Sequence, residues 1–162
     1  MASRTSRPRL PLSFLAALTA FGIAMGHLEA VVVVYIRHIM GIVPTPEQLD
    51  PATMAKVPEW IIVSEQGREA ATIIMLAALG FLAGRNALER LATFLYAFGV
   101  WDIFYYVSLK VQLDWPASLG THDCLFLIPK PWYAPVWLPV AISLGMMAIA
   151  LVMFSASQRR RG

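Results

Sequence analysis

Apolar side chains fill four long stretches of the chain, and polar residues gather between them and at both ends. The stretches cover about residues 10–36, 60–84, 91–109 and 134–154. A helix needs roughly 20 residues to cross the hydrocarbon core of a bilayer, and each stretch is about that long or longer. The pattern predicts an all-α fold, an integral membrane four-helix transmembrane bundle forming one domain over residues 1–162, with outer connections at 41–59 and 110–133.

The composition agrees with this pattern and excludes a soluble globular protein. The chain is 58% hydrophobic and 14% charged, with a mean hydropathy of +0.62. Its net charge of +3 does not indicate nucleic acid binding, because the basic residues lie in short clusters beside apolar stretches. The single cysteine, Cys124, excludes an intrachain disulfide framework and a Cys-x-x-Cys site.

The arginines predict the orientation. Basic residues precede the first stretch, separate the second from the third, and end the chain, at Arg4, Arg7, Arg9, Arg85, Arg90, Arg159, Arg160 and Arg161. With four spans all of these lie on one side, so the positive-inside rule places both termini in the cytoplasm.

The first apolar stretch follows the basic segment "RTSRPR", as the apolar part of a signal peptide would. However, it resumes as "AVVVVYI" after "HLE" without a small-residue cleavage site, so we expect an uncleaved span. We expect a multi-pass protein of a bacterial inner membrane.

The first span carries ionisable residues that need a partner. His27, Glu29, Arg37 and His38 interrupt it, and an unpaired charge at the bilayer centre costs about 3 kcal/mol. The helical rise places His27 and Glu29 in the outer leaflet, and it places Glu65, Arg68 and Glu69 of the second span at the same depth. Asp102 reaches the middle or outer half of the third span. Carboxylates from three helices are therefore expected in one layer.

Helical periodicity predicts which of these side chains face inward. Glu65, Arg68 and Glu69 form one stripe of the second helix, and Asp102, Tyr105 and Tyr106 form one of the third. On the first helix, Glu29 shares a side with Gly22, Met25 and Gly26, whose small residues permit close packing. His27 points about 200° away from Glu29, toward another subunit or a distorted groove.

Two kinds of site follow from this layer. A divalent metal would be held by carboxylates on facing helices, with Glu29, Glu65, Glu69, Asp102 and His27 as candidate ligands. For catalysis the candidates are Glu65, Glu69, Asp102, Tyr105, Tyr106 and Arg68. Second-rank candidates are His38, His122 and Asp123. Because Glu65 and Glu69 are like charges at i, i+4, one of them needs a retained proton, neutralisation by Arg68, or a shared cation. Neither a Glu-x-x-His nor a His-x-x-x-His pattern accompanies them.

The last outer connection predicts a cap over this pocket. Prolines oppose a regular helix through residues 129–135, and the tryptophans around them are typical of a membrane-interface belt, so we expect an interfacial lid over 110–133.

Three functions remain open. The pocket binds a divalent metal or a polar lipid-like substrate, as in a small membrane enzyme. Alternatively, it is a metal-free acid-base isomerase or cyclase acting on an isoprenoid or other lipid. In the third reading the chain is a non-catalytic accessory subunit, with the charges as interhelical salt bridges. The expected partners are the lipid bilayer, a lipid-like small molecule, and a membrane protein or a second copy of the chain.

Overall fold

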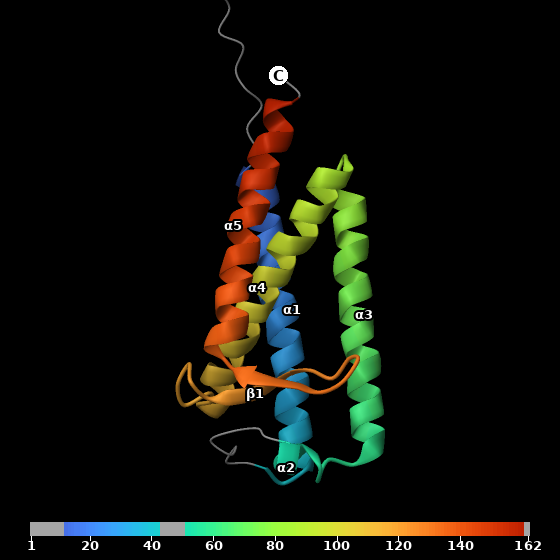
Figure 1. Cartoon of the computed structure of the whole chain (residues 1–162), viewed down its shortest axis with the longest axis vertical. Coiled ribbons are helices and arrows are strands. Elements are labelled where there is room, and N and C mark those ends of the chain that lie inside the picture. The colour runs from blue at the N-terminus through green and yellow to red at the C-terminus, as the bar shows by residue number, and fades with distance from the viewer. Residues whose placement is uncertain (1–11, 43–50, 161–162) are drawn as a thin grey trace, which may run out of the picture.

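The computed structural model describes residues 12–42 and 51–160, which are mostly helical (Figure 1). Its elements in chain order are α1 (Leu12–Ile39), α2 (Pro51–Met54), α3 (Glu59–Ala83), α4 (Ala87–Leu113), β1 (His122–Phe126), β2 (Trp132–Pro135) and α5 (Trp137–Arg159). Among the described residues, α1, α4 and α5 are long and apolar enough to cross a membrane. The prediction of a mainly helical protein with helices long and apolar enough to cross a membrane is thus confirmed. The arginines of residues 1–11 and Arg161 lie outside the described residues.

Helix α4 is longer than the predicted span over 91–109 because both of its ends are capped. The side chain of Asn86 accepts a hydrogen bond from the backbone N–H of Glu89 at 2.9 Å, which satisfies one free donor of the first turn. At the other end Asp114 adopts a left-handed conformation with φ of 52°, and its N–H donates to the carbonyl of Lys110. The helix therefore reaches well beyond the apolar stretch at both ends.

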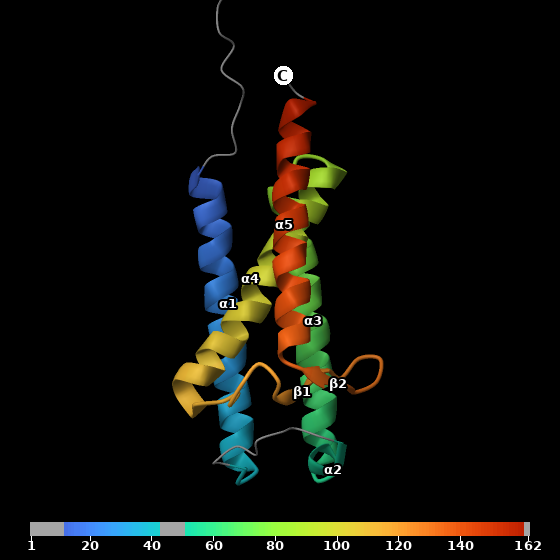
Figure 2. The same ribbon diagram turned by 60° about the vertical axis from the view of Figure 1, so that its left-hand side comes forward.

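Helix α4 is also the centre of the packing, in contact with α1, α3 and α5 (Figures 1 and 2). Two glycines allow α4 to pack closely on α1 and α5. A Cβ on Gly26 of α1 would lie 2.5 Å from the carbonyl oxygen of Trp101, and one on Gly99 of α4 would lie 2.6 Å from that of Ser143. Backbones packed this closely gain dispersion contacts that a larger residue would prevent. Helix α3 joins α4 by a short turn and stands beside it.

The connection expected as an irregular lid contains a β-hairpin that was not predicted. Strands β1 and β2 pair antiparallel with His122 opposite Pro135 and Cys124 opposite Tyr133. The last span correspondingly begins at Trp137 rather than at residue 134, because Trp132–Pro135 belongs to β2. Prolines in the loop and at the end of β2 oppose a helix here. They are compatible with a short two-stranded sheet, because both of its strands are edge strands and proline is tolerated there. In Figure 1 the hairpin extends from the start of α5 across to α3.

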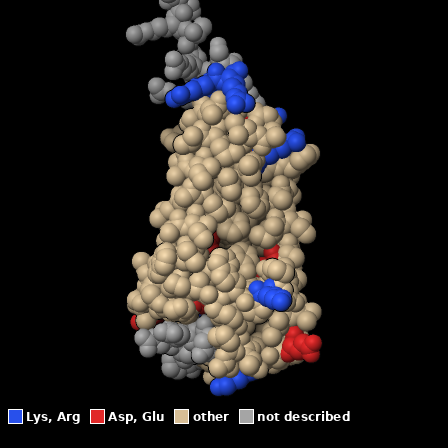
Figure 3. Space-filling view, viewed as in Figure 1, with Lys and Arg blue, Asp and Glu red and all other residues tan. Residues whose placement is uncertain are grey.

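Charge is unevenly spread along the molecule. On the face in Figure 3, basic side chains gather at the end that carries the C terminus, and acidic side chains together with further basic ones are visible in the hairpin half. A broad uncharged band lies between them, as expected where lipid tails surround a protein.

Candidate functional site

A cavity of about 140 Å³ lies between α1, α3, α4 and the hairpin. Seven of the eight predicted catalytic or metal-binding residues line it, and they are Glu29, Glu65, Arg68, Glu69, Asp102, Tyr105 and Tyr106. The exception is His27, which is exposed and not part of the lining. The lining also includes apolar side chains, which we term the apolar wall, at Val33, Ile36, Ile61, Ile62 and Phe126. The cavity therefore joins the predicted polar layer to an apolar surface.

Arg68 bridges two helices at the polar end of the cavity. Its Nη1 lies 2.8 Å from Glu29 Oε1 on α1, and its Nε lies 2.9 Å from Glu65 Oε2, one turn earlier on α3. The second oxygen of Glu29 accepts a hydrogen bond from the indole N–H of Trp101 on α4. Because the side chains of Arg68 and Glu29 are 26% and 15% exposed, bulk water screens this pair weakly. Arg68 and Glu29 together thus connect α1, α3 and α4.

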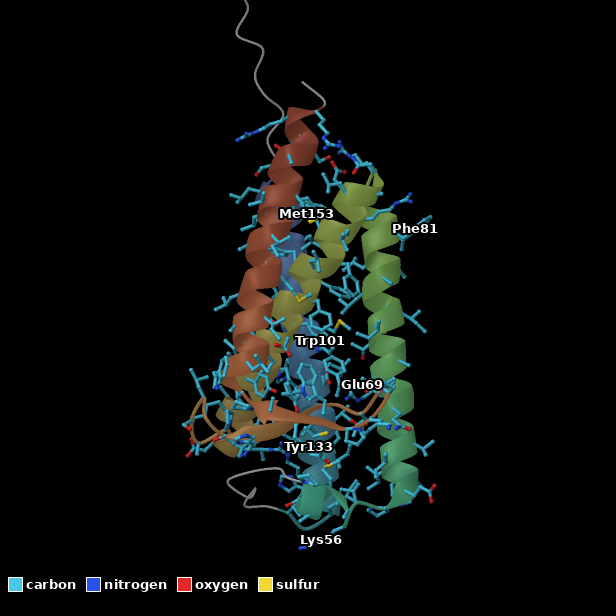
Figure 4. All side chains as sticks on the ribbon, viewed as in Figure 1. Lys56, Glu69, Phe81, Trp101, Tyr133 and Met153 are labelled. Carbon is cyan, nitrogen blue, oxygen red and sulfur yellow. The ribbon has the colours of Figure 1, made fainter. Side chains whose placement is uncertain are left out.

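Glu69 connects α3 to the hairpin loop rather than to Arg68. Its carboxylate accepts hydrogen bonds from the backbone N–H groups of Leu127 and Ile128, all at 3.1 Å. One turn earlier, the Gln66 amide donates to the Leu127 carbonyl at 3.4 Å. Figure 4 shows Glu69 on α3 where the hairpin approaches that helix. The like charges of Glu65 and Glu69 are therefore relieved separately, the first by Arg68 and the second by backbone donors.

Asp102 and Tyr105 bring polar atoms from α4 to the cavity. Asp102 Oδ2 accepts a hydrogen bond from the Ser143 hydroxyl of α5 at 2.8 Å. Tyr105 packs edge-on against Tyr106, with 4.9 Å between ring centroids. Its hydroxyl forms no hydrogen bond within residues 12–42 and 51–160. Asp102 thus receives the Ser143 hydrogen bond, and the Tyr105 hydroxyl receives none from the described residues.

Asp123 is the buried acid of the hairpin. Its Oδ2 accepts a hydrogen bond from the Tyr106 hydroxyl at 3.1 Å, and its Oδ1 accepts one from the Cys124 N–H at 2.9 Å. Burial raises the pKa of Asp123 to about 6, although the positive charge of Arg37 opposes this rise. Burial also raises the pKa of the neighbouring Cys124 thiol to about 12, so this thiol is a poor nucleophile at neutral pH.

Arg37 lines the cavity but is not among the site residues predicted from the sequence. Its side chain is 2% exposed, and its guanidinium lies 4.1 Å from the centre of the Trp115 ring. The signal was present in the spacing, since Arg37 follows Gly26, Ala30 and Val33 at intervals of four, three and four residues. Trp101 and Ser143 were missed for a different reason, because neither residue type in an apolar helix predicts a specific carboxylate partner.

The histidines do not gather with the carboxylates. His27, His38 and His122 are all exposed, and none lines the cavity. His38 Nδ1 lies 2.8 Å from the carbonyl oxygen of Val34 in its own helix. In the described part of the chain, no three His, Cys, Asp or Glu side chains are arranged to hold a metal ion. The geometry instead suits recognition of a polar group by an ion-paired layer and hydroxyls.

Comparison with protein-family models, with curated proteins and with solved structures finds no match for this chain. Its function is therefore inferred from the geometry of the cavity.

Proposed function

We propose that this chain is a small multi-pass membrane protein that binds a polar, lipid-like molecule in the cavity between α1, α3, α4 and the hairpin. The observation that supports this function is that the lining of one cavity combines apolar side chains with an ion-paired cluster. Val33, Ile36 and Ile62 line it together with Glu29, Glu65 and Arg68. A ligand with a hydrocarbon part and a polar head satisfies both surfaces, whereas a purely apolar or purely polar ligand leaves one of them unmatched.

The proposed topology has four spans, with α3 as the fourth. Its 25 residues are about 37 Å long, which is enough for the hydrocarbon core. Large apolar side chains are exposed along it, among them Val63, Ile74 and Phe81, as on a surface that meets lipid. Glu65, Arg68 and Glu69 line the cavity, where Arg68 and the hairpin amides compensate the carboxylates.

Both termini are proposed to be cytoplasmic, in a bacterial inner membrane. Arg85 and Arg159 lie in the turn after α3 and in the last turn of α5, at the end opposite the hairpin, as positive-inside orientation requires. A green fluorescent protein fused after residue 162 should fluoresce, and alkaline phosphatase inserted within 43–50 should be active. The reverse result would refute this orientation.

Native mass spectrometry tests the binding function. Protein extracted in a nonionic detergent should carry one amphiphile per chain. Ile62→Trp, which adds volume inside the cavity, should lose this adduct, whereas Ile74→Trp on the exposed face of the same helix should keep it. An adduct of equal occupancy in both variants would place the bound molecule elsewhere and contradict the proposal.

Acid-base chemistry on the bound molecule is the second candidate function. The observation that favours it is that Asp102 and Tyr105 both line the cavity with hydrogen-bonding capacity left over. A buried carboxylic acid can donate a proton to a double bond, and a nearby tyrosine can stabilise the resulting cation. If the protein converts its ligand, Asp102→Asn supplied with a saturating concentration of the amphiphile should bind it and leave it unchanged, as judged by the mass of the bound species. Conversion at the wild-type rate would exclude Asp102 as the acid.

A further inference from the structure

The lining of the cavity carries an excess of negative charge. Its carboxyl groups are Glu29, Glu65, Glu69, Asp102 and Asp123, and its basic groups are Arg37 and Arg68. With all of them ionised, five negative charges face two positive charges. No lysine or histidine lies in the lining to change this balance.

Protein groups compensate most of these charges, but not all. Arg68 is shared between Glu29 and Glu65 and can neutralise one of them. Glu69 is stabilised by three backbone N–H contacts, and Arg37 acts on Asp123. Asp102 has the Ser143 hydroxyl as its hydrogen-bond donor. The charge on Asp102 and one charge of the Glu29 and Glu65 pair therefore lack a cationic partner in the described lining. Uncompensated charge in a low dielectric is costly, so a bound cation would be favoured.

Aromatic faces lie beside this excess charge. Trp101, Tyr105 and Tyr106 line the cavity together with Asp102, and Phe126 contributes from the hairpin. Aromatic rings attract organic cations through their negative faces, most strongly where water is excluded. Carboxylates surrounded by tryptophan and tyrosine form a better environment for an alkylammonium group than for a phosphate or a carboxylate, which the acidic excess would repel.

We infer that the molecule bound in this cavity is a cationic amphiphile, with a substituted ammonium head beside Asp102, Glu65 and Trp101 and a hydrocarbon chain that passes along the apolar wall and continues out of the cavity. This inference rests on the proposed function and specifies the charge of its ligand. Glu65 and Asp102 attract the head, and Arg68 holds Glu29 and Glu65 in place. The hairpin residues Asp123 to Leu127 close the cavity on the outer side.

Three probes with the same chain and different heads test the inference. They are dodecyltrimethylammonium, dodecanol and laurate, each labelled with tritium and measured by scintillation proximity on full-length protein immobilised in nonionic maltoside micelles. No cationic lipid competes under these conditions. Signal from Ile62→Trp is subtracted as micelle partitioning, because that variant fills the cavity. The ammonium probe should bind about tenfold more tightly than dodecanol, and laurate should bind more weakly still.

Substitutions then identify the groups that recognise the charge. Asp102→Asn and Glu65→Gln should each weaken dodecyltrimethylammonium binding about tenfold and leave dodecanol binding unchanged. Glu59→Gln, an exposed acid at the start of α3 outside the lining, serves as the matched control and should change neither. Equal or tighter binding of dodecanol or laurate in the wild type would overturn the cationic head while leaving the amphiphile site intact. If no probe binds above the Ile62→Trp background, the proposed function fails as well.

Discussion

Both carboxylate oxygens of Glu69 lie 3.1 Å from the backbone nitrogen of Leu127, 58 residues further along the chain. This contact joins the middle of α3 to the loop of the hairpin. Ile128 donates to the same carboxylate, so one side chain satisfies two backbone donors that a tight loop would otherwise expose. Hydrogen bonds to a charged acceptor are among the stronger ones, which makes Glu69 the main polar attachment of the hairpin to α3.

Substitution of Glu69 should release the hairpin loop. Glu69→Leu keeps the helix but removes the acceptor, and the loss should cost about 1–3 kcal/mol because two donors become unsatisfied. Hydrogen exchange of the 127 and 128 amides should speed up, while amides in the centre of α4 keep their protection. Glu59→Leu, on the same helix but exposed, is the control. Unchanged exchange at 127 and 128 would show that the rest of the hairpin holds the loop without Glu69.

The position of Arg68 between Glu29 and Glu65 gives a second prediction. Arg68→Met should destabilise the protein by about 3 kcal/mol, because it leaves two partly buried carboxylates without their counter-ion. Glu29→Gln combined with Glu65→Gln in the Arg68→Met background should recover much of the loss, since no charge then remains to be compensated. Thermal unfolding midpoints in detergent measure both effects. The control is Lys110→Met, which breaks an ion pair with the 92% exposed side chain of Asp114 and should change stability by less than about 1 kcal/mol. Equal effects of the two substitutions would refute the structural role of Arg68.

The helical stripes could be predicted from sequence because they depend on local geometry. Helical spacing alone groups Glu65, Arg68 and Glu69 on one face, and the same rule separates His27 from Glu29. The bond from Glu69 to Leu127 could not be predicted in this way. It depends on where the hairpin folds back, and that position is set by strand pairing between Cys124 and Tyr133 rather than by any pattern within α3.

The close packing of α1 on α4 gives the third prediction. Gly26→Ala should lower the unfolding midpoint clearly, since the new Cβ would lie 2.5 Å from the Trp101 carbonyl oxygen and must push the helices apart. Gly145→Ala is the matched control in α5, where a Cβ meets nothing within 4 Å. This control should leave the midpoint unchanged or raise it, because alanine favours the helix by up to about 1 kcal/mol. A Gly26→Ala variant as stable as wild type would show that α1 and α4 are not packed as described.

Burial of Asp123 predicts a pH dependence of stability with a definite sign. Its pKa is about 6 in the folded chain against an ordinary 3.8, mainly because burial disfavours the carboxylate and despite the opposing charge of Arg37. The folded state therefore holds this proton more tightly than the unfolded state. Protonated Asp123 therefore adds to the free energy of unfolding. This contribution is fully present below about pH 4 and is lost as the pH rises through about 6, for a total of at most about 3 kcal/mol.

Asp123→Asn isolates this contribution, because asparagine does not titrate and can still accept the hydrogen bond from Tyr106. Ionisable groups that do not interact with Asp123 contribute equally to both proteins and cancel in the difference. Unfolding midpoints of wild type and variant should therefore diverge between about pH 4 and pH 7, with the wild type losing stability relative to Asp123→Asn. Parallel profiles would mean that Asp123 titrates as an ordinary aspartate. A wild type that gains stability relative to the variant over this range would show that the attraction of Arg37 for the carboxylate outweighs its burial.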